Sequence, residues 1–514
     1  MRLKTLTAAF ALPLVGLQAS PAPAQQTAAT APTSPPRFGA PLGLPRDGDK
    51  LYIPDEKFPE VPRPAGWEAY SDIDGVRAKQ VAGEITAIAR KSRDDGNQFW
   101  GRITGTVYDH MTQDWVEAQF RQIGLSDVRR QPLKMEPLWY PESWSVSASA
   151  DGAALSLKSA FPILDTVGTT KAGLTAEAVW LGLGTDADFV GRDVRGKAVF
   201  LYSIATPGGR AHSANWNGAI KRAVNAGAGM VFVVMGFPGD AITEPQSGAT
   251  SVPAFTVSSD EGDAVRAALG AGRKVSVHVT ADIGKREGLT TGNVWGVLPG
   301  ATDESILIMA HTDSFFEGAL DNASGIAMML ELARHYARTP QSERKRTLVF
   351  LTTPAHHQSF VGIEWVRNNY DFSKTAFIMN CEHPSQTMMY LLDAGVMTAN
   401  TVSARRWYIN GSPALNDKIT GTLRDYGVSL YAQPERRPGG ELYFIFHKAP
   451  SFHVLDHVIY HSTIDTLDMV PASGITAVGR AYASIIDQVN GMNLAELRPA
   501  QVPAAAPALS EVSH

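Results

Sequence analysis

The order of apolar and polar residues predicts alternating strands and helices in the second half of the chain. Apolar residues return with helical spacing over Ser324–Arg338 and Ile475–Val489. Continuous apolar runs, typical of buried strands, lie at Ser305–Ala310, Thr347–Thr352, Ala376–Glu382 and Ser451–Leu455. This alternation predicts an α/β fold in which helices sandwich a mostly parallel sheet.

The first half of the chain has a different pattern of apolar and polar residues. Val76–Ala89 and Gln113–Ile123 have the apolar spacing of helices, and Gly124 closes the second. From about residue 150 to residue 285, short apolar runs alternate with Gly-rich turns, and one helix is predicted between the last two. The predicted strands are Val179–Leu183, Ala198–Tyr202 and Met230–Met235, and the helix is Ala219–Ala226. We expect a separate β-rich module inserted into the α/β domain.

The two ends of the chain have the composition of processing and linker segments. Arg2 and Lys4 precede an apolar run that is too short to span a bilayer, and Ala22-Pro23-Ala24 follows it. Residues 1–24 are therefore predicted to be a secretory signal that directs the protein out of the cytoplasm, to the periplasm or the medium. Residues 25–50 and 496–514 are rich in Ala and Pro and are expected to be disordered.

Charge and cysteine content narrow the classes of function. The formal net charge is −5 for all 514 residues. Removal of the signal, with Arg2 and Lys4, makes it −7. This balance offers no basic surface for nucleic acid. Cys381 is the only cysteine, so no intramolecular disulfide can form and stability must come from core burial. No later stretch is apolar enough to span a membrane, so we expect a soluble exported protein.

The most informative stretch for chemistry follows the strand predicted at Ser305–Ala310. His311 and Asp321 are residue types that bind divalent metals. Asp313 lies two residues after His311, where it could hold the imidazole in place. This segment predicts part of a metal site and requires ligands from elsewhere in the chain.

The other predicted strands end near further metal-binding residues. His356 and His357 follow the second strand after a short turn, Glu382 ends the third, and His461 follows the last. Ligands of open parallel sheets bind at the carboxyl ends of the strands. We therefore expect these side chains to converge with His311 and Asp321 on one site.

Several motifs in these segments resemble those of the co-catalytic zinc exopeptidases, which include bacterial leucyl aminopeptidases and the glutamate carboxypeptidases. The resemblance covers roughly residues 78 to 490. It rests on His311-Thr312-Asp313, on Gly318–Gly325 and on Tyr460–Thr466, with weaker likeness at Gly101–Gly105. Residues 150–287 look like the protease-associated insert of that family, marked by Ala223–Val234 and Val252–Phe255.

The resemblance implies a role for each candidate residue. Asp321 would bridge two metals, and His311 and His461 would be ligands. The family has a Glu-Glu pair where this chain has His356-His357, and an Asp where it has Glu382. By position, His357 and Glu382 would be ligands and His356 the general base, with Asp313 as a second catalytic residue. Imidazole can serve in both roles.

These observations together predict an exported, aminopeptidase-like hydrolase of peptide or small amide bonds. One or two zinc ions, or another divalent metal, would be its cofactor. The resemblance implies that residues 51–149 begin the peptidase domain and that residues 288–495 form its catalytic part. Neither the oligomeric state nor the amide that is cut follows from the sequence.

Three alternatives stay open at this stage. The chain could be a metal-binding homologue that has lost its catalytic base. It could be an acyl transferase similar to the glutaminyl cyclases, although those generally lack an inserted module. It could also hold a single iron or other metal at Asp321, His357 and His461, because two histidines and one carboxylate form such sites.

Overall fold

The computed structural model describes residues 46–47, 50–51, 61–204, 212–216, 218–237, 240–244, 248–392, 395–455, 459 and 461–498. The chain divides into two compact units, Met1–Pro35 and Pro36–His514, and every described residue belongs to the second. The predicted signal, almost all of the predicted linker, Tyr460 and the tail beyond residue 498 lie outside the described residues. In the part of the chain that is described, no helix is long and apolar enough to cross a bilayer.

The first of two large sheets carries the predicted strand ends. Its strand order is β20-β21-β17-β14-β16-β13-β4. The four strands β21, β17, β14 and β16 are parallel, and the flanking strands pair antiparallel with them. The bounds are β20 Arg406–Asn410, β21 Ser451–Leu455, β17 Thr375–Asn380, β14 Ser305–His311, β16 Thr347–Thr353, β13 Thr290–Leu298 and β4 Ser126–Lys134.

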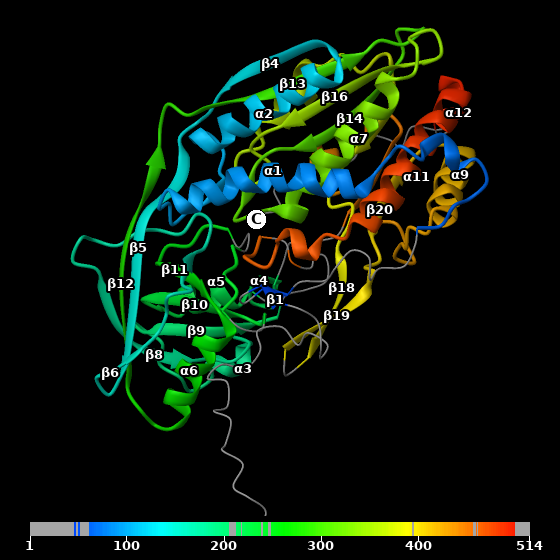
Figure 1. Ribbon diagram of the computed structural model, residues 1–514. Coiled ribbons are helices and arrows are strands. Elements are labelled where there is room, and N and C mark those ends of the chain that lie inside the picture. The colour runs from blue at the N-terminus through cyan, green and yellow to red at the C-terminus, as the bar shows by residue number, and fades with distance from the viewer. Residues whose placement is uncertain are drawn as a thin grey trace, which may run out of the picture. The chain divides into compact units, whose positions relative to one another are not determined.

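Helices cover both faces of this sheet, as the continuous apolar strands require. In β14, Ile306, Ile308 and Ala310 belong to one core cluster, and Leu307 and Met309 belong to another. The first cluster contains residues of α1 Gly75–Asp94, α2 Val107–Ile123, α7 Gly325–Ala337, α9 Pro413–Asp425 and α11 Ala472–Gly491. The second contains residues of α8 Val361–Asn369 and α10 Leu442–Ile445. The predicted helix-covered α/β core is thereby confirmed, and its parallel part is the central four strands (Figure 1).

The second sheet is built from the β-rich middle of the chain. Its order is β6-β5-β12-β8-β9-β10-β11-β7, and β8 to β11 are parallel. The bounds are β5 Leu138–Ala150, β6 Ala153–Leu155, β7 Phe161–Pro162, β8 Leu174–Trp180, β9 Ala198–Ser203, β10 Met230–Met235, β11 Ala254–Val257 and β12 Val275–Arg286. Its helices are α3 Asp186–Phe189, α4 Ser213–Trp216, α5 Ala219–Asn225 and α6 Ser259–Gly270.

The long strands β5 and β12 connect this sheet to the rest of the chain. They pair antiparallel from Leu138–Arg286 to Ala150–Val275, and Figure 1 shows them running together along their length. The second sheet thus begins before residue 150, where the sequence pattern changes. The strand predicted at Val179–Leu183 is displaced to β8, because β8 alternates exposed and buried residues and lacks a continuous apolar run. Identification of this module as protease-associated stays a prediction.

Smaller elements complete the described structure. The segment after β14 pairs with the segment between α1 and α2 through β15 and β3. The bounds are β1 Arg46–Asp47, β2 Lys50–Leu51, β3 Gly101–Arg102, β15 Ser314–Phe315, β18 Thr387–Leu392, β19 Gly395–Val402 and α12 Leu494–Leu497, with helical turns at Trp67–Tyr70, Ala319–Ser324 and Leu467–Met469.

A buried histidine in β21 makes the fold sensitive to acid. His453 is fully buried, and neither of its ring nitrogens has a hydrogen-bond partner among the described residues. Burial lowers the pKa of His453 to about 4. The unfolded chain binds a proton at His453 more readily than the folded chain does. The unfolding free energy is therefore at its full value above about pH 6.5, where His453 is neutral in both states, and it decreases as the pH falls toward 4.

We therefore expect His453→Phe to reduce the acid sensitivity of folding. The parent should lose about 2 kcal/mol more unfolding free energy than the variant between about pH 7.5 and about pH 5. Urea denaturation of both proteins in the presence of a chelator measures the difference. Equal pH dependence in the two proteins would show that His453 is solvated or paired in the native state.

Candidate metal centre

The candidate ligands come from the carboxyl ends of the four parallel strands. β14 ends at His311, β16 leads into His356 and His357, β17 leads into Glu382, and His461 follows β21. Asp321 lies in the turn that enters α7. The side chains of these residues are all nearly inaccessible to solvent.

The Asp321 carboxylate is the meeting point of the site. Its Oδ1 lies 3.0 Å from His311 Nε2 and 2.9 Å from His383 Nε2. Its Oδ2 lies 3.2 Å from His357 Nε2 and 3.4 Å from His461 Nε2. Four histidines from four separate segments therefore surround one carboxylate.

The donor atoms form three sets that have the spacing of metal ligands. Within each set, one nitrogen or oxygen per residue lies within 4.8 Å of the others. The sets are Asp321 with His357 and His461, His311 with His356 and Glu382, and His311 with Asp321 and His383. The structure thus brings together all five ligands predicted from the sequence, and it adds His383.

An unpartnered polar atom in this cluster fits a bound cation. Glu382 Oε1 is buried and has no hydrogen-bond partner within the described part of the chain. Buried polar groups without partners are rare, and an ion is one of the usual reasons for them. The mixture of imidazole and carboxylate donors is the one that zinc prefers.

Carboxylates behind the histidines fix their positions. Asp313 accepts hydrogen bonds from the backbone amides of His356 and His357, both at 3.0 Å. His311 Nδ1 lies 3.2 Å from the Asp313 carbonyl oxygen and 3.7 Å from its carboxylate. Asp313 therefore contacts His311 mainly through its backbone carbonyl oxygen, whereas its carboxylate fixes the backbone of His356 and His357.

The turn that carries Asp321 is itself held from two sides. The Asp465 carboxylate accepts from the backbone amides of Leu320 at 2.6 Å and Asp321 at 3.1 Å. The buried Arg102 guanidinium donates to the carbonyl oxygens of Thr312 and Glu317 at 2.9 and 3.0 Å. A Cβ at Gly325 would lie 2.3 Å from the Cys381 carbonyl oxygen, so glycine allows α7 to begin against the end of β17.

Two candidate ligands have a backbone conformation that non-glycine residues rarely adopt. His383 has φ 45° and His461 has φ 53°, both in the left-handed region. Such conformations cost about 1–3 kcal/mol each and persist where surrounding contacts impose them. Their occurrence at both histidines indicates that ligand placement outweighs local backbone preference.

The electrostatics favour positive charge beside Asp321. Burial opposes ionisation of Asp321, but His357, His311 and His383 outweigh it and hold the pKa of Asp321 well below its usual value. Burial likewise opposes charging of His311, yet Asp313 and Asp321 raise the pKa of His311 well above its usual value. A cation would satisfy the same carboxylates.

Sequence reasoning missed His383 and Glu244, and it did not connect Glu441 with His356. His383 directly follows Glu382, and this proximity to a predicted ligand was the one available signal. The family resemblance placed Glu441 near the substrate, and the structure shows that it accepts from His356 Nδ1 at 2.8 Å. Glu244 belongs to the inserted region, and nothing in its local sequence points to the site.

Glu244 reaches His461 because the inserted region pairs with the loop that carries this histidine. Thr243 forms a β-bridge with Ser462, and the backbone amide of Glu244 donates to the His461 carbonyl oxygen at 2.9 Å. His461 Nδ1 lies 3.2 Å from the Glu244 carbonyl oxygen and 3.6 Å from its carboxylate. The Glu244 side chain is completely buried. The β-rich region therefore contributes directly to the position of one candidate ligand.

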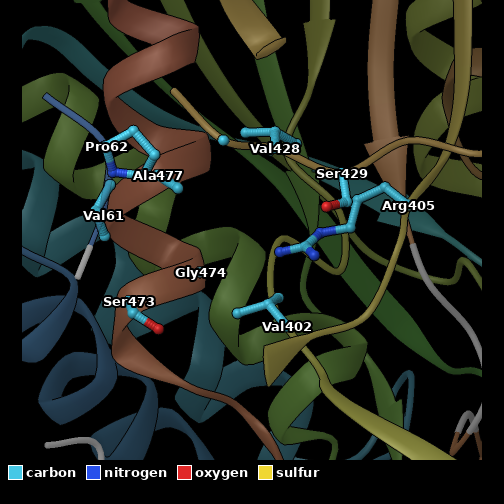
Figure 2. Close-up of a pocket in the computed structure, with 10 residues that line it drawn as sticks. Val61, Pro62, Val402, Arg405, Val428, Ser429, Ser473, Gly474 and Ala477 are labelled. Carbon is cyan, nitrogen blue, oxygen red and sulfur yellow. The ribbon is translucent and has the colours of Figure 1, made fainter. Parts of the chain in front are cut away.

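A separate cavity of about 230 Å³ is lined by residues of α11 and of the segments beside it, and it contains none of the candidate ligands (Figure 2). Its one charged lining residue is Arg405, whose guanidinium donates to the Pro384 carbonyl oxygen at 2.9 Å. Arg405 thus supports the backbone just after His383. The cavity offers no donor set comparable to that around Asp321.

Comparison with known proteins identifies the class of domain. Residues 293–486 match the model of Peptidase family M28, which confirms the resemblance seen in the sequence. No match was found among curated protein sequences.

Solved structures share the fold at low sequence identity. A peptidase M28 precursor from Shewanella amazonensis SB2B has 17% identity and a TM-score of 0.64, over 84% of this chain and 97% of its own. BSAP, a zinc aminopeptidase from Bacillus subtilis, has 17% identity and a TM-score of 0.59, over 83% and 98%. An aminopeptidase from Aneurinibacillus sp. strain AM-1 has 20% identity and a TM-score of 0.54, over 87% and 97%.

The contact between Glu244 and His461 leads to a prediction about metal affinity. Glu244→Gln keeps the size of the side chain and an acceptor for the Leu164 amide, but it removes the buried charge beside His461. We expect divalent-metal affinity to fall by about 10–100-fold, the usual effect of losing an outer partner of a ligand histidine. Competition titration with a chelator measures it.

The exposed Glu287 in the same region provides the matched control, Glu287→Gln, which should bind metal as the parent does. Parent-like affinity in Glu244→Gln would mean that the Glu244 backbone carbonyl alone orients His461.

Proposed function

We propose that this chain is an exported metal-dependent hydrolase of peptide or small amide bonds, with aminopeptidase-like chemistry. The observation that carries this proposal is the buried Asp321 carboxylate, which joins two metal-ligand sets within an M28 peptidase domain. The names of the similar structures from Bacillus subtilis and Aneurinibacillus support aminopeptidase activity. Export rests on the predicted signal at residues 1–24.

The proposed cofactor is zinc, as one or two ions. Asp321, His357 and His461 would hold one ion, and His311 with Glu382 would contribute to a second, with Asp321 shared between them. Bound zinc acts as a Lewis acid and lowers the pKa of coordinated water to about 7. The third set, with His383, places another imidazole beside Asp321 that could support its orientation.

The residues of this chain orient the candidate ligands and exclude water from the site. Asp313 fixes the backbone of the histidine pair, and Asn380 donates to Glu382 Oε2 at 2.6 Å, which leaves Oε1 available. The carboxylates and imidazoles are buried, where electrostatic interactions are stronger than in water. Preorganised groups of this kind are the main source of rate enhancement in many hydrolases.

The position of His356 bears on the proton-transfer step. The sequence prediction makes His356 the general base of the reaction. Its Nδ1 is hydrogen-bonded to Glu441, so Nε2 is the nitrogen that remains for a proton or for a ligand bond. A positioned base contributes about 10²–10⁴-fold to rate, so the role of His356 has a measurable consequence.

Replacement of Asp321 tests the proposed function most simply. We expect Asp321→Ala to lose metal and hydrolytic activity together, because this carboxylate lies within reach of both ligand sets. Metal content of the purified protein and hydrolysis of a panel of aminoacyl and blocked amides measure the two effects.

The exposed Asp371 provides a control, since Asp371→Ala should keep both properties. Full metal occupancy in Asp321→Ala would contradict the shared role of this carboxylate. A parent that binds zinc tightly and cleaves nothing in the panel would instead be a metal-binding homologue.

A further inference from the structure

The environment of His356 is that of a metal ligand. Its ring stacks on His311, with centroids 4.0 Å apart and planes 13° from parallel. Its Nδ1 lies 2.8 Å from Glu441 Oε2. Histidines that bind metals almost always direct their second ring nitrogen to a carboxylate, a carbonyl or water. Glu441 provides this partner.

The donor spacing around His356 supports the same role. His356, His311 and Glu382 form one of the three sets whose donor atoms lie within 4.8 Å of one another. In this set, Glu382 Oε1 is buried without a hydrogen-bond partner in the described residues. This unpartnered oxygen and the imidazoles of His311 and His356 therefore meet at one place.

The loop that carries Glu441 packs closely against this set of residues. Gly440 has φ 59°, and a Cβ there would lie 2.2 Å from Glu382 Oε2, so no other residue fits without displacing Glu382. Glu441 is completely buried, and its other carboxylate oxygen accepts from Thr353 Oγ1 at 3.1 Å. The consecutive residues 440 and 441 thus pack against one ligand and hold another.

We propose that His356 is a ligand of a second metal ion, together with His311 and Glu382, and that Glu441 is the residue that positions it. This inference rests on the proposed metal-dependent function and assigns His356 a different role from that of general base. The histidine pair would then divide between the two sites: His356 joins His311 and Glu382, and His357 joins Asp321 and His461.

The backbone positions of His356 and His357 explain why the two rings face different donor sets. Asp313 binds the two successive amides, one with each carboxylate oxygen, and fixes both residues at the end of β16. The rings of His356 and His357 are nearly perpendicular, with an interplanar angle of 84°. Perpendicular rings on a fixed backbone direct their nitrogens toward different sets of donors.

Glu441 also supplies charge that an imidazole ligand lacks. Asp321 and Glu382 are the only carboxylates in the two sets, so two divalent cations would be incompletely neutralised by their direct ligands. A buried carboxylate on the outer nitrogen of His356 raises the basicity of the ligand and adds negative charge close to the cation. His356 and Glu441 together therefore act as an extended anionic ligand.

Zinc titration of the full chain and of single variants tests this assignment. We expect the parent to show two classes of site. His356→Ala should weaken one class more than about 100-fold and leave the other unchanged, because loss of a ligand exceeds the effect of losing an outer partner. His357→Ala should weaken the other class. The half-buried His278 in β12 gives the control, His278→Ala, which should bind as the parent does.

Glu441 is tested by a spectroscopic readout as well as by affinity. Glu441→Gln should weaken the His356-dependent class by about 10–100-fold and shift the visible absorption of the cobalt-substituted protein. Glu441→Asp should recover part of the affinity, because it keeps the charge. A purely structural role would change thermal unfolding of the metal-free protein and leave the cobalt spectrum of the occupied sites unaltered.

Two outcomes separate the failure of this inference from that of the proposed function. If His356→Ala binds zinc with parent affinity and stoichiometry while hydrolysis falls, His356 is a base and this inference is overturned, but the proposed function stands. If the parent binds zinc at neither set, the proposed function fails and this inference fails with it. A parent with a single site that His356→Ala leaves unaffected also contradicts the inference.

Discussion

The structure of the site depends on one buried carboxylate that is shared by histidines from four chain segments. Asp321 lies within 3.4 Å of the imidazoles of His311, His357, His383 and His461. A carboxylate can be kept ionised at this depth only where positive charge is close by. The surrounding structure serves this requirement: Arg102 and Asp465 fix the turn that carries Asp321, and the parallel strands bring the histidines to it.

His356 and His357 bring imidazoles, and not carboxylates, into the neighbourhood of Asp321. Buried carboxylates lie one step further out, behind the histidines. Asp313 holds the backbone of the pair, Glu441 holds His356, and Glu244 lies beside His461. Carboxylates thus lie behind the histidines as well as among the candidate ligands. The β-rich region takes part in this arrangement through Glu244.

The sequence predicted the core of the site because that part depends on local pattern. Each parallel strand has a buried apolar run, and the polar residue after it must lie at the carboxyl edge of the sheet. The same reasoning could not find Glu244 or the contact of Glu441 with His356, because both depend on how distant loops pack. It also predicted neither β5 nor β12, which pair with each other and alternate between buried and exposed residues over much of their length.

The most direct test of this account is a crystal structure of the protein loaded with zinc, with anomalous scattering recorded at the zinc absorption edge. The account predicts two zinc peaks in each chain. One should lie among Asp321, His357 and His461, and the other among His311, His356 and Glu382, with His356 Nε2 about 2 Å from the metal. A single peak at Asp321, or two peaks with His356 outside bonding distance of both, would contradict it.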